Sequence, residues 1–263
     1  MSDSDYKKNY LTEVIFRINF SNILKLAGDN KEAADKFQKE IFEEFPNVHF
    51  QYNKNVNIQV DIKEGNSQST VDEGDLTWIF SDENNFKQVE LNSKNLILVY
   101  HKGAYNGFDK FLNDVSVLLR ALRWYSPFKV TFLGLRYINQ IHEDIINEKN
   151  IKEYINNDLI NNIIFNLNEN ENFSQLFSRL DLLQEDYHLT FQFGFFNPKF
   201  PEITIEKDFI LDYDCRLIKD DSVNSQRDIE IELTNMNEII KEKFNYSISD
   251  KLRKLMGGKN DSD

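Results

Sequence analysis

The sequence is poor in cysteine, proline and glycine, and it has fewer basic than acidic residues. Cys215 is the one cysteine among 263 residues, so the chain can form no internal disulfide and no zinc site built from several thiolates. Four prolines and nine glycines give no flexible linker by composition, so the parts of the chain are expected to pack together. The net charge of −13 disfavours nucleic-acid binding, because a phosphate backbone is held mainly by Lys and Arg.

Motifs of established chemistry are also absent. There is no G-x-x-x-x-G-K or G-x-G-x-x-G phosphate loop, no G-x-S-x-G nucleophile elbow and no H-E-x-x-H zinc motif. The sequence therefore predicts no cofactor, no metal site and no catalytic residue, and it favours a non-enzymatic protein over an enzyme. It shows neither an apolar signal sequence nor a run of ~18 apolar residues, which predicts a cytoplasmic protein without a membrane partner.

Apolar residues, by contrast, are abundant, with 22 Phe and 11 Tyr, and their spacing predicts the secondary structure. Alternation with period two predicts strands over residues 13–20, 48–62, 76–81, 86–91, 95–101, 129–141, 177–184, 187–196 and 202–217. Helical spacing predicts helices over residues 31–45, 108–124, 151–165 and in the C-terminal part. Asn235 and Ser247 are the expected N-terminal caps of two C-terminal helices. Residues 65–73 are expected to form a polar loop.

The order of these elements repeats along the chain. Each half runs strand, helix, three or four strands, helix, the first over residues 11–126 and the second over 127–258. Residues 1–10 and 259–263 are expected to be disordered. The sequence thus predicts an α+β fold of two similar, closely packed halves, each a curved antiparallel sheet that grips a long helix. This order resembles that of the helix-grip folds, such as the TATA-binding-protein-like class, and suggests an internal duplication.

Four stretches together resemble a known protein family. The most specific is the strand 134–139, which reads Gly-Leu-Arg-Tyr-Ile-Asn, and the others are 11–20, 211–214 and the closing helices 236–257. Over nearly its whole length the chain resembles a sporadically distributed, largely uncharacterised bacterial family. The patchy distribution of that family is similar to that of genes in mobile or phage-defence islands. The resemblance therefore implies a conditional role in a bacterial defence or mobile-island module.

Arg136 is the first candidate for a binding residue. Both faces of strand 129–141 carry bulky apolar residues, so the strand is expected to be central and buried. A buried guanidinium needs a partner, and Asp212 and Asp214 on a late strand are the candidates. The functional interpretation is a site for a small anionic ligand, formed by Arg136, Asn139, Asp212 and Asp214. The structural interpretation, which the sequence favours, is an ion pair that fixes the order of the strands.

Other groups suggest partners or a place in the core. Phe196 and Phe200 lie in a loop, where they either contact a protein partner or plug the open end of a curved sheet. Cys215 alternates with apolar residues and is expected to be a small core residue. A local basic patch is the one place where the sequence allows nucleic-acid contact, although cations also suit a helix C-terminus; it consists of Lys251, Arg253, Lys254 and Lys259.

Two function hypotheses follow from these features. In the first, the protein is a non-enzymatic interaction or sensor component that binds a protein partner, either encoded nearby or a second copy of the chain. Its acidic surface would steer a basic partner toward it. In the second, the protein is a small-ligand-binding protein or an enzyme that uses a cavity near Arg136, with Asp212 or Asp214 as a base or a metal ligand.

Overall fold

The computed structural model describes residues 6–61, 66–147, 149–160, 174–202, 207–218, 223 and 225–257, with side chains throughout these ranges except 53–75. The strands of this part are β1 Leu11–Phe20, β2 Asn47–Asp61, β3 Asn66–Ser81, β4 Lys87–Leu91, β5 Asn95–His101, β6 Val130–Ile141, β7 Leu176–Gln184, β8 Tyr187–Phe195 and β9 Phe209–Leu217. Its α-helices are α1 Lys31–Ile41, α2 Phe108–Leu122, α3 Ile151–Tyr154, α4 Asn157–Ile160, α5 Gln226–Ser247 and α6 Asp250–Leu255.

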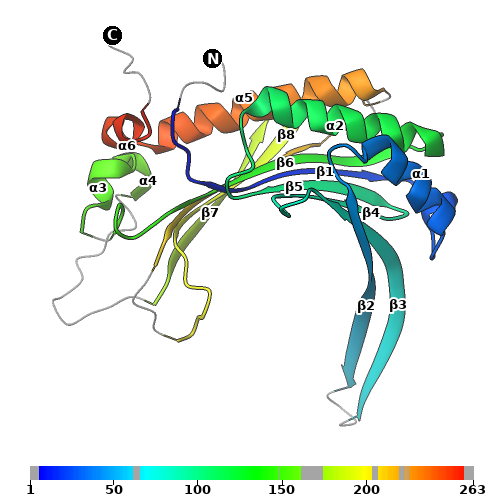
Figure 1. Cartoon of the computed structure of the whole chain (residues 1–263). Helices are drawn as coiled ribbons and strands as arrows, with labels where there is room; N and C mark the ends of the chain where they lie inside the picture. Colours follow the sequence, from blue (N-terminus) through cyan, green and yellow to red (C-terminus); the bar gives the residue numbers. More distant parts are fainter. Residues whose placement is uncertain are drawn as a thin grey trace.

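The protein is α+β, and the nine strands of its described part form one open antiparallel sheet. Their order is β2-β3-β4-β5-β1-β6-β9-β8-β7, which places β1 and β6 near the centre. The long helices α2 and α5 lie side by side on one face of this sheet (Figure 1). The sheet is strongly curved, and β2 and β3 on one side and β7 on the other bend away from the helices (Figure 1).

Alternation along the strands separates the two faces of the sheet. In β1, Val14, Phe16 and Ile18 are fully buried toward the helices, whereas Glu13 and Arg17 point to the other side. Strand β8 repeats the pattern, with its five aromatic and aliphatic side chains buried at every second position, as predicted. We call the side that carries Glu13 and Arg17, together with the residues in register with them, the helix-free face.

The helices are amphipathic and cover the other face. Phe111, Val115 and Leu122 of α2 are fully buried, which confirms the helix predicted from their spacing. Helix α5 begins with a capping box in which Ser225 and Asp228 satisfy each other's backbone N–H groups. No helix among the described residues is long and apolar enough to cross a membrane.

The predicted caps of the C-terminal helices are wrong. Helix α5 begins at Gln226, so Asn235 lies inside it, and the capping signal that the chain uses is Ser225 with Asp228. The next helix, α6, is capped by Ser249, whose side chain accepts a hydrogen bond from the Leu252 N–H, and not by Ser247. In both cases several Ser and Asn residues fit the cap pattern, and packing of the apolar stripe decides at which of them the helix begins.

Two further predictions differ from the structure. Residues 66–73 are not a loop but part of β3, which pairs with β2 over nearly its whole length. A hairpin ladder satisfies the backbone of polar residues, so polarity alone does not predict a loop. The predicted helix 151–165 is interrupted after Tyr154, because Ile155 forms an isolated bridge with Ile248. Residues 161–165 lie outside the described part.

Residues near the chain ends are only partly described. Tyr6 donates a hydrogen bond to the Asn245 side chain at 2.6 Å, and the Lys8 N–H donates to the Met256 carbonyl at 3.0 Å. These contacts hold the stretch 6–10 against α5 and the end of α6. Residues 1–5 and the predicted disordered tail 259–263 lie outside the described residues. The predicted division at residue 126 stays a prediction.

Candidate functional site

The centre of the helix-free face is polar. In the ladders of β6, β9, β8 and β7, Arg136 stands opposite Asp214, Asp214 opposite Thr190, and Thr190 opposite Asp181. A neighbouring row of the same face runs from Ile138 through Asp212 and Gln192 to Arg179. Directly opposite side chains on one face of an antiparallel pair are close enough to interact. Charged and polar residues from four adjacent strands therefore meet on one concave surface.

Arg136 and Asp212 form a bidentate ion pair in these rows. The Arg136 Nε and Nη2 atoms donate to the two carboxylate oxygens of Asp212 at 2.8 and 2.6 Å. These hydrogen bonds raise the pKa of Arg136 above its ordinary value, against the effect of its partial burial. Asp212 is buried, whereas 37% of the Arg136 side chain is exposed. The predicted burial of Arg136 is therefore only partial, because helices cover only one face of β6.

Both of these hydrogen bonds of Arg136 go to Asp212 and not to Asp214, although Asp214 stands opposite Arg136 in the ladder. Its partial burial raises its pKa above the ordinary value, and the attraction of Arg136, Arg216 and His188 does not offset this. The neighbouring charge of Asp212 adds to the increase. Burial thus disfavours the charged form of Asp214 more than its basic neighbours favour it, and carboxylates with a perturbed pKa are frequent among functional groups.

Replacing Asp214 by Asn is expected to raise the free energy of unfolding at pH 7 by about 1 kcal/mol. The raised pKa means that the folded state binds this proton more tightly than the unfolded state, so the charged form opposes folding at neutral pH. The gain should shrink as the pH falls and Asp214 becomes protonated. Urea unfolding at pH 7 and pH 5 measures both effects. Glu83→Gln, in an exposed turn, is the control, and a destabilised Asp214→Asn would contradict the assignment.

The polar surface continues to the edge strand β7. Asp181 accepts hydrogen bonds from Arg179 at 2.9 and 3.1 Å and from the Thr190 hydroxyl at 2.8 Å. The Nε2 atom of His188 lies 3.2 Å from Asp181. The hydrogen bonds from Arg179 are the main reason why the pKa of Asp181 is lowered to about 2. Arg179 and Asp181 are exposed, so they provide charged groups at the rim of the concave surface.

Asn139 lies on the opposite side of the sheet from Arg136. It is buried on the helix-covered face, and its Nδ2 atom is 3.5 Å from the Leu211 carbonyl. The prediction that Arg136 and Asn139 share a site is therefore wrong, since their odd spacing of three puts them on opposite faces of a strand. Asn139 instead lines a separate cavity beside α5, whose lining does not include Arg136.

Phe196 and Phe200 lie in the loop between β8 and β9. Their exposed fractions are 43% and 62%, whereas Phe195 next to them is 1% exposed and completes the core. Phe196 also contacts the Phe177 ring, at 5.7 Å between centroids. Such exposure does not fit the alternative in which these rings plug the sheet. Large parts of both side chains are therefore exposed in this loop.

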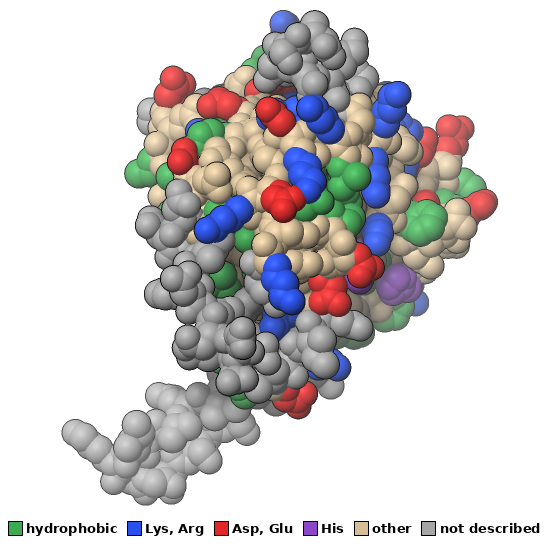
Figure 2. Space-filling model, turned by 90° about the vertical axis from the view of Figure 1, so that its left-hand side faces the viewer, with side chains coloured by type: hydrophobic (Ala, Val, Ile, Leu, Met, Phe, Trp, Pro, Cys, Tyr) green, Lys and Arg blue, Asp and Glu red, His purple; other side chains and the backbone are tan. Residues whose placement is uncertain are grey.

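The predicted basic patch is largely neutralised within the protein. Lys251 pairs with Glu153, and Arg253 pairs with Asp250 at 2.6 Å. Lys259 lies outside the described residues. On this end of the molecule, basic and acidic side chains are interspersed (Figure 2). In the described ranges no group of three or more His, Cys, Asp or Glu residues is placed to hold a metal ion.

Cys215 is fully buried and belongs to the core, as predicted. Burial raises the pKa of its thiol to about 12, so the thiolate that a nucleophile requires is not formed at neutral pH. The rows on the helix-free face were missed in the sequence, although His188, Thr190 and Gln192 are the outward positions of a clearly alternating strand. Their partners come from β7 and β9, which only the strand order identifies.

Comparison with the models of known protein families finds no match, and no curated protein is significantly similar to the chain. What the protein does must therefore be inferred from the geometry of its surfaces.

Proposed function

We propose that the protein is a non-enzymatic binding protein that holds a protein partner on its helix-free face. The observation that carries the proposal is Asp214, an incompletely compensated carboxylate at the centre of a concave polar surface. A basic side chain or a backbone N–H group of a partner would supply the compensation that Arg136 gives to Asp212. The net charge of −13 would attract a partner with basic residues.

The strand order supports the proposed duplication into two helix-grip halves. From the contact between β1 and β6, the sheet runs outward as β1-β5-β4-β3-β2 on one side and as β6-β9-β8-β7 on the other. In the first half, β1 is followed by the last strand of that half, β5, and then by β4, β3 and β2. In the second half, β6 is followed by the last strand, β9, and then by β8 and β7. The long helices α2 and α5 follow β5 and β9 in the same way. Two such halves would form a saddle whose concave side is the helix-free face.

The small-anion hypothesis at Arg136 has less support. Asp212 already uses two N–H groups of the guanidinium, and Asp214 places a second negative charge beside it. An anion would have to displace a buried carboxylate. A partner protein requires no such exchange. The resemblance of the chain to a family with a mobile-island distribution fits a partner encoded nearby, and a second copy of the chain is the other candidate.

Affinity purification of the tagged full-length chain from its native host tests this function. The wild type should recover a protein partner in stoichiometric amounts, and Asp214→Asn should reduce the recovery about tenfold through loss of a charge-assisted hydrogen bond. Glu83→Gln removes the same charge from an exposed turn and should recover the partner fully. Recovery of a single chain alone, or equal recovery by Asp214→Asn, would contradict the proposal.

Phe196 and Phe200 are the second part of the proposed interface. Replacing both with Ser is expected to abolish partner capture and to change the free energy of unfolding by less than about 1 kcal/mol, because both rings are exposed. Phe86, with 49% of its area exposed in another turn, provides the matched control Phe86→Ser. Thermal unfolding and pull-down are measured on the same samples. Unchanged capture by the double variant would remove this loop from the interface.

A further inference from the structure

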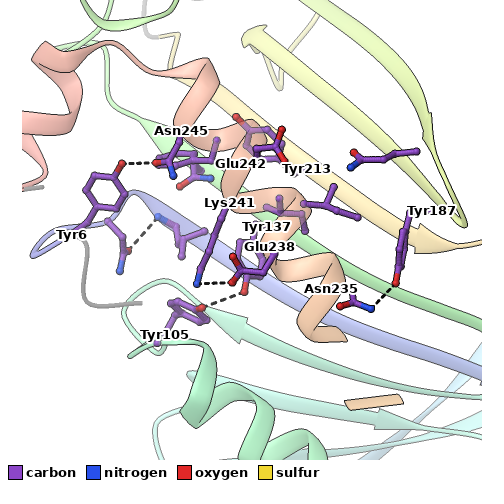
Figure 3. A pocket seen from close by; sticks show the side chains of 18 of the residues that line it. Tyr6, Tyr105, Tyr137, Tyr187, Tyr213, Asn235, Glu238, Lys241, Glu242 and Asn245 are labelled. Atoms are coloured by element: carbon purple, nitrogen blue, oxygen red, sulfur yellow. Dashed lines mark hydrogen bonds and ion pairs between the residues drawn. The ribbon is translucent and has the colours of Figure 1, made fainter. Parts of the chain in front are cut away.

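A cavity of about 1160 Å³ lies on the helix-covered side of the sheet, away from the proposed partner surface. Its walls come from the N-terminal stretch before β1, the loop that leads into α2, the turn between β7 and β8, and the middle of α5 (Figure 3). This volume is slightly above the range of about 300–1,000 Å³ that is usual for small-molecule sites. The cavity is therefore large enough for an elongated ligand.

Five tyrosines contribute to the walls of this cavity, and hydrogen bonds hold several of them in place. Tyr105 and Tyr137 are joined through their hydroxyl groups at 3.1 Å, and the Tyr137 hydroxyl donates to Asn237 at 2.8 Å. Tyr187 donates to Glu232 and accepts a hydrogen bond from Asn235 at 2.9 Å. Figure 3 shows the Tyr105–Tyr137 pair and the Tyr187–Asn235 pair at separate ends of the cavity. Fixed aromatic rings favour ligands that combine apolar segments with positive charge.

Carboxylates are found toward both ends of the cavity. Glu185 and Glu232 lie beside Tyr187, whereas Glu238 and Glu242 lie on later turns of α5. Glu232 and Glu238 are six residues apart, which corresponds to about 9 Å along an α-helix. Aliphatic and aromatic side chains, among them Ile239, contribute to the wall. The cavity thus has acidic groups that are separated by about 9 Å along α5.

The acidic groups of the cavity outnumber its basic groups. Five carboxylates line it, including Asp186, against the two ammonium groups of Lys7 and Lys241. Lys241 pairs with Glu238 at 3.4 Å and leaves the excess of negative charge in place. In a partly enclosed site such an excess repels phosphates and carboxylates and attracts cations.

We propose that this cavity binds a linear polyamine, with ammonium groups at the Glu232 and Glu238 ends and the methylene chain along the tyrosine rings. Acidic groups at both ends of the cavity match a ligand with at least two separated amines. A compact cation with one charge could neutralise only one of them. This site is separate from the helix-free face, so binding of a polyamine and of a protein partner can each occur or fail independently.

Isothermal titration calorimetry of the full chain with spermidine at ~0.15 M salt tests the inference. Saturable binding with one site is expected. Methylamine, with one charge, and 1,8-octanediol, with a similar chain but no charge, should bind at least about tenfold more weakly. Glu232→Gln and Glu238→Gln should each weaken spermidine about tenfold through loss of a charge-assisted hydrogen bond. Glu40→Gln, on the exposed side of α1, is the control that removes one charge elsewhere.

Three results would overturn the inference. One is the absence of saturable heat with spermidine in a chain with an unchanged circular dichroism spectrum. Another is equal weakening by Glu40→Gln and by the cavity variants, because this would mean that spermidine follows the net charge of the whole protein. The third is equal affinity for methylamine and spermidine, which would show that one acidic end is sufficient. The Glu232→Gln/Glu238→Gln double variant provides a further check, since two independent ends should give additive losses.

Discussion

Replacing Asp114 by Asn is expected to lower the free energy of unfolding by about 3–5 kcal/mol, the largest effect of any single substitution considered for this protein. Asp114 lies on the buried side of α2 and is 0% exposed. Its carboxylate is 2.8 Å from the Lys87 ammonium and 3.0 Å from that of Lys110, and it accepts a hydrogen bond from the Tyr100 hydroxyl. Without the charge of Asp114, Lys87 would remain nearly buried with only one acidic partner, Glu44.

The pH dependence of this cluster follows from the pKa of Asp114. Burial disfavours the charged form, but the hydrogen bonds from Lys87, Tyr100 and Lys110 outweigh it and lower the pKa below its ordinary value of 3.8. A lowered pKa means that the cluster stabilises the fold above about pH 4 and that this contribution disappears as the pH falls further. The difference between wild type and Asp114→Asn should therefore be constant near neutral pH and shrink in acid.

Urea unfolding at pH 7 measures the loss, with Asp35→Asn as the control. Asp35 forms an i,i+4 pair with Lys39 on the exposed side of α1, at 2.5 Å, and such a pair is worth about 0–1 kcal/mol. For a chain of this size a loss of 3 kcal/mol corresponds to a fall of roughly 6–12 °C in Tm. Equal losses for Asp114→Asn and Asp35→Asn would show that the Asp114 cluster is not a buried network.

The periodicity of apolar residues predicted the strands and helices that bury one face in the core. Strands β1 and β8 and helix α2 were found correctly because each buries one face in the same core. The polar first part of β3, residues 66–73, was missed because its stabilisation comes from backbone pairing with β2, to which residue polarity contributes little. The spacing of apolar side chains predicts which residues are buried. It predicts the pairing of strands only where the paired strands also bury one face.

The candidate site was less predictable because it depends on which strands become neighbours. The pair of Arg136 with Asp212 was foreseen as one of two options, and residue chemistry alone could not choose between Asp212 and Asp214. Arg136 stands opposite Asp214 in the ladder, yet its long side chain reaches the diagonal neighbour Asp212. The burial of Asp114 was not indicated by the sequence either, since aspartates are almost never fully buried unless they are paired.

The ion pair of Arg136 with Asp212 provides the decisive comparison between an architectural and a binding role. Replacing Arg136 by Met is expected to lower the free energy of unfolding by about 2–3 kcal/mol, because Asp212 would keep only a long contact to Gln192, at 3.4 Å. This loss is below that of a fully enclosed pair, since part of the Arg136 side chain is exposed.

The double variant Arg136→Met/Asp212→Leu removes both charges and should recover stability to within about 1 kcal/mol of the wild type, because two apolar side chains need no partners. Urea unfolding of the two single variants and the double variant gives the coupling energy. If the helix-free face binds the protein partner through Asp214 as proposed, the double variant should still capture it, since Asp214 is retained and has lost the attraction of Arg136. Loss of capture by a stable double variant would contradict this role of Asp214 and assign the ion pair of Arg136 with Asp212 to the interface. The double variant thus tests the role of the pair in binding without the loss of stability that is expected for Arg136→Met.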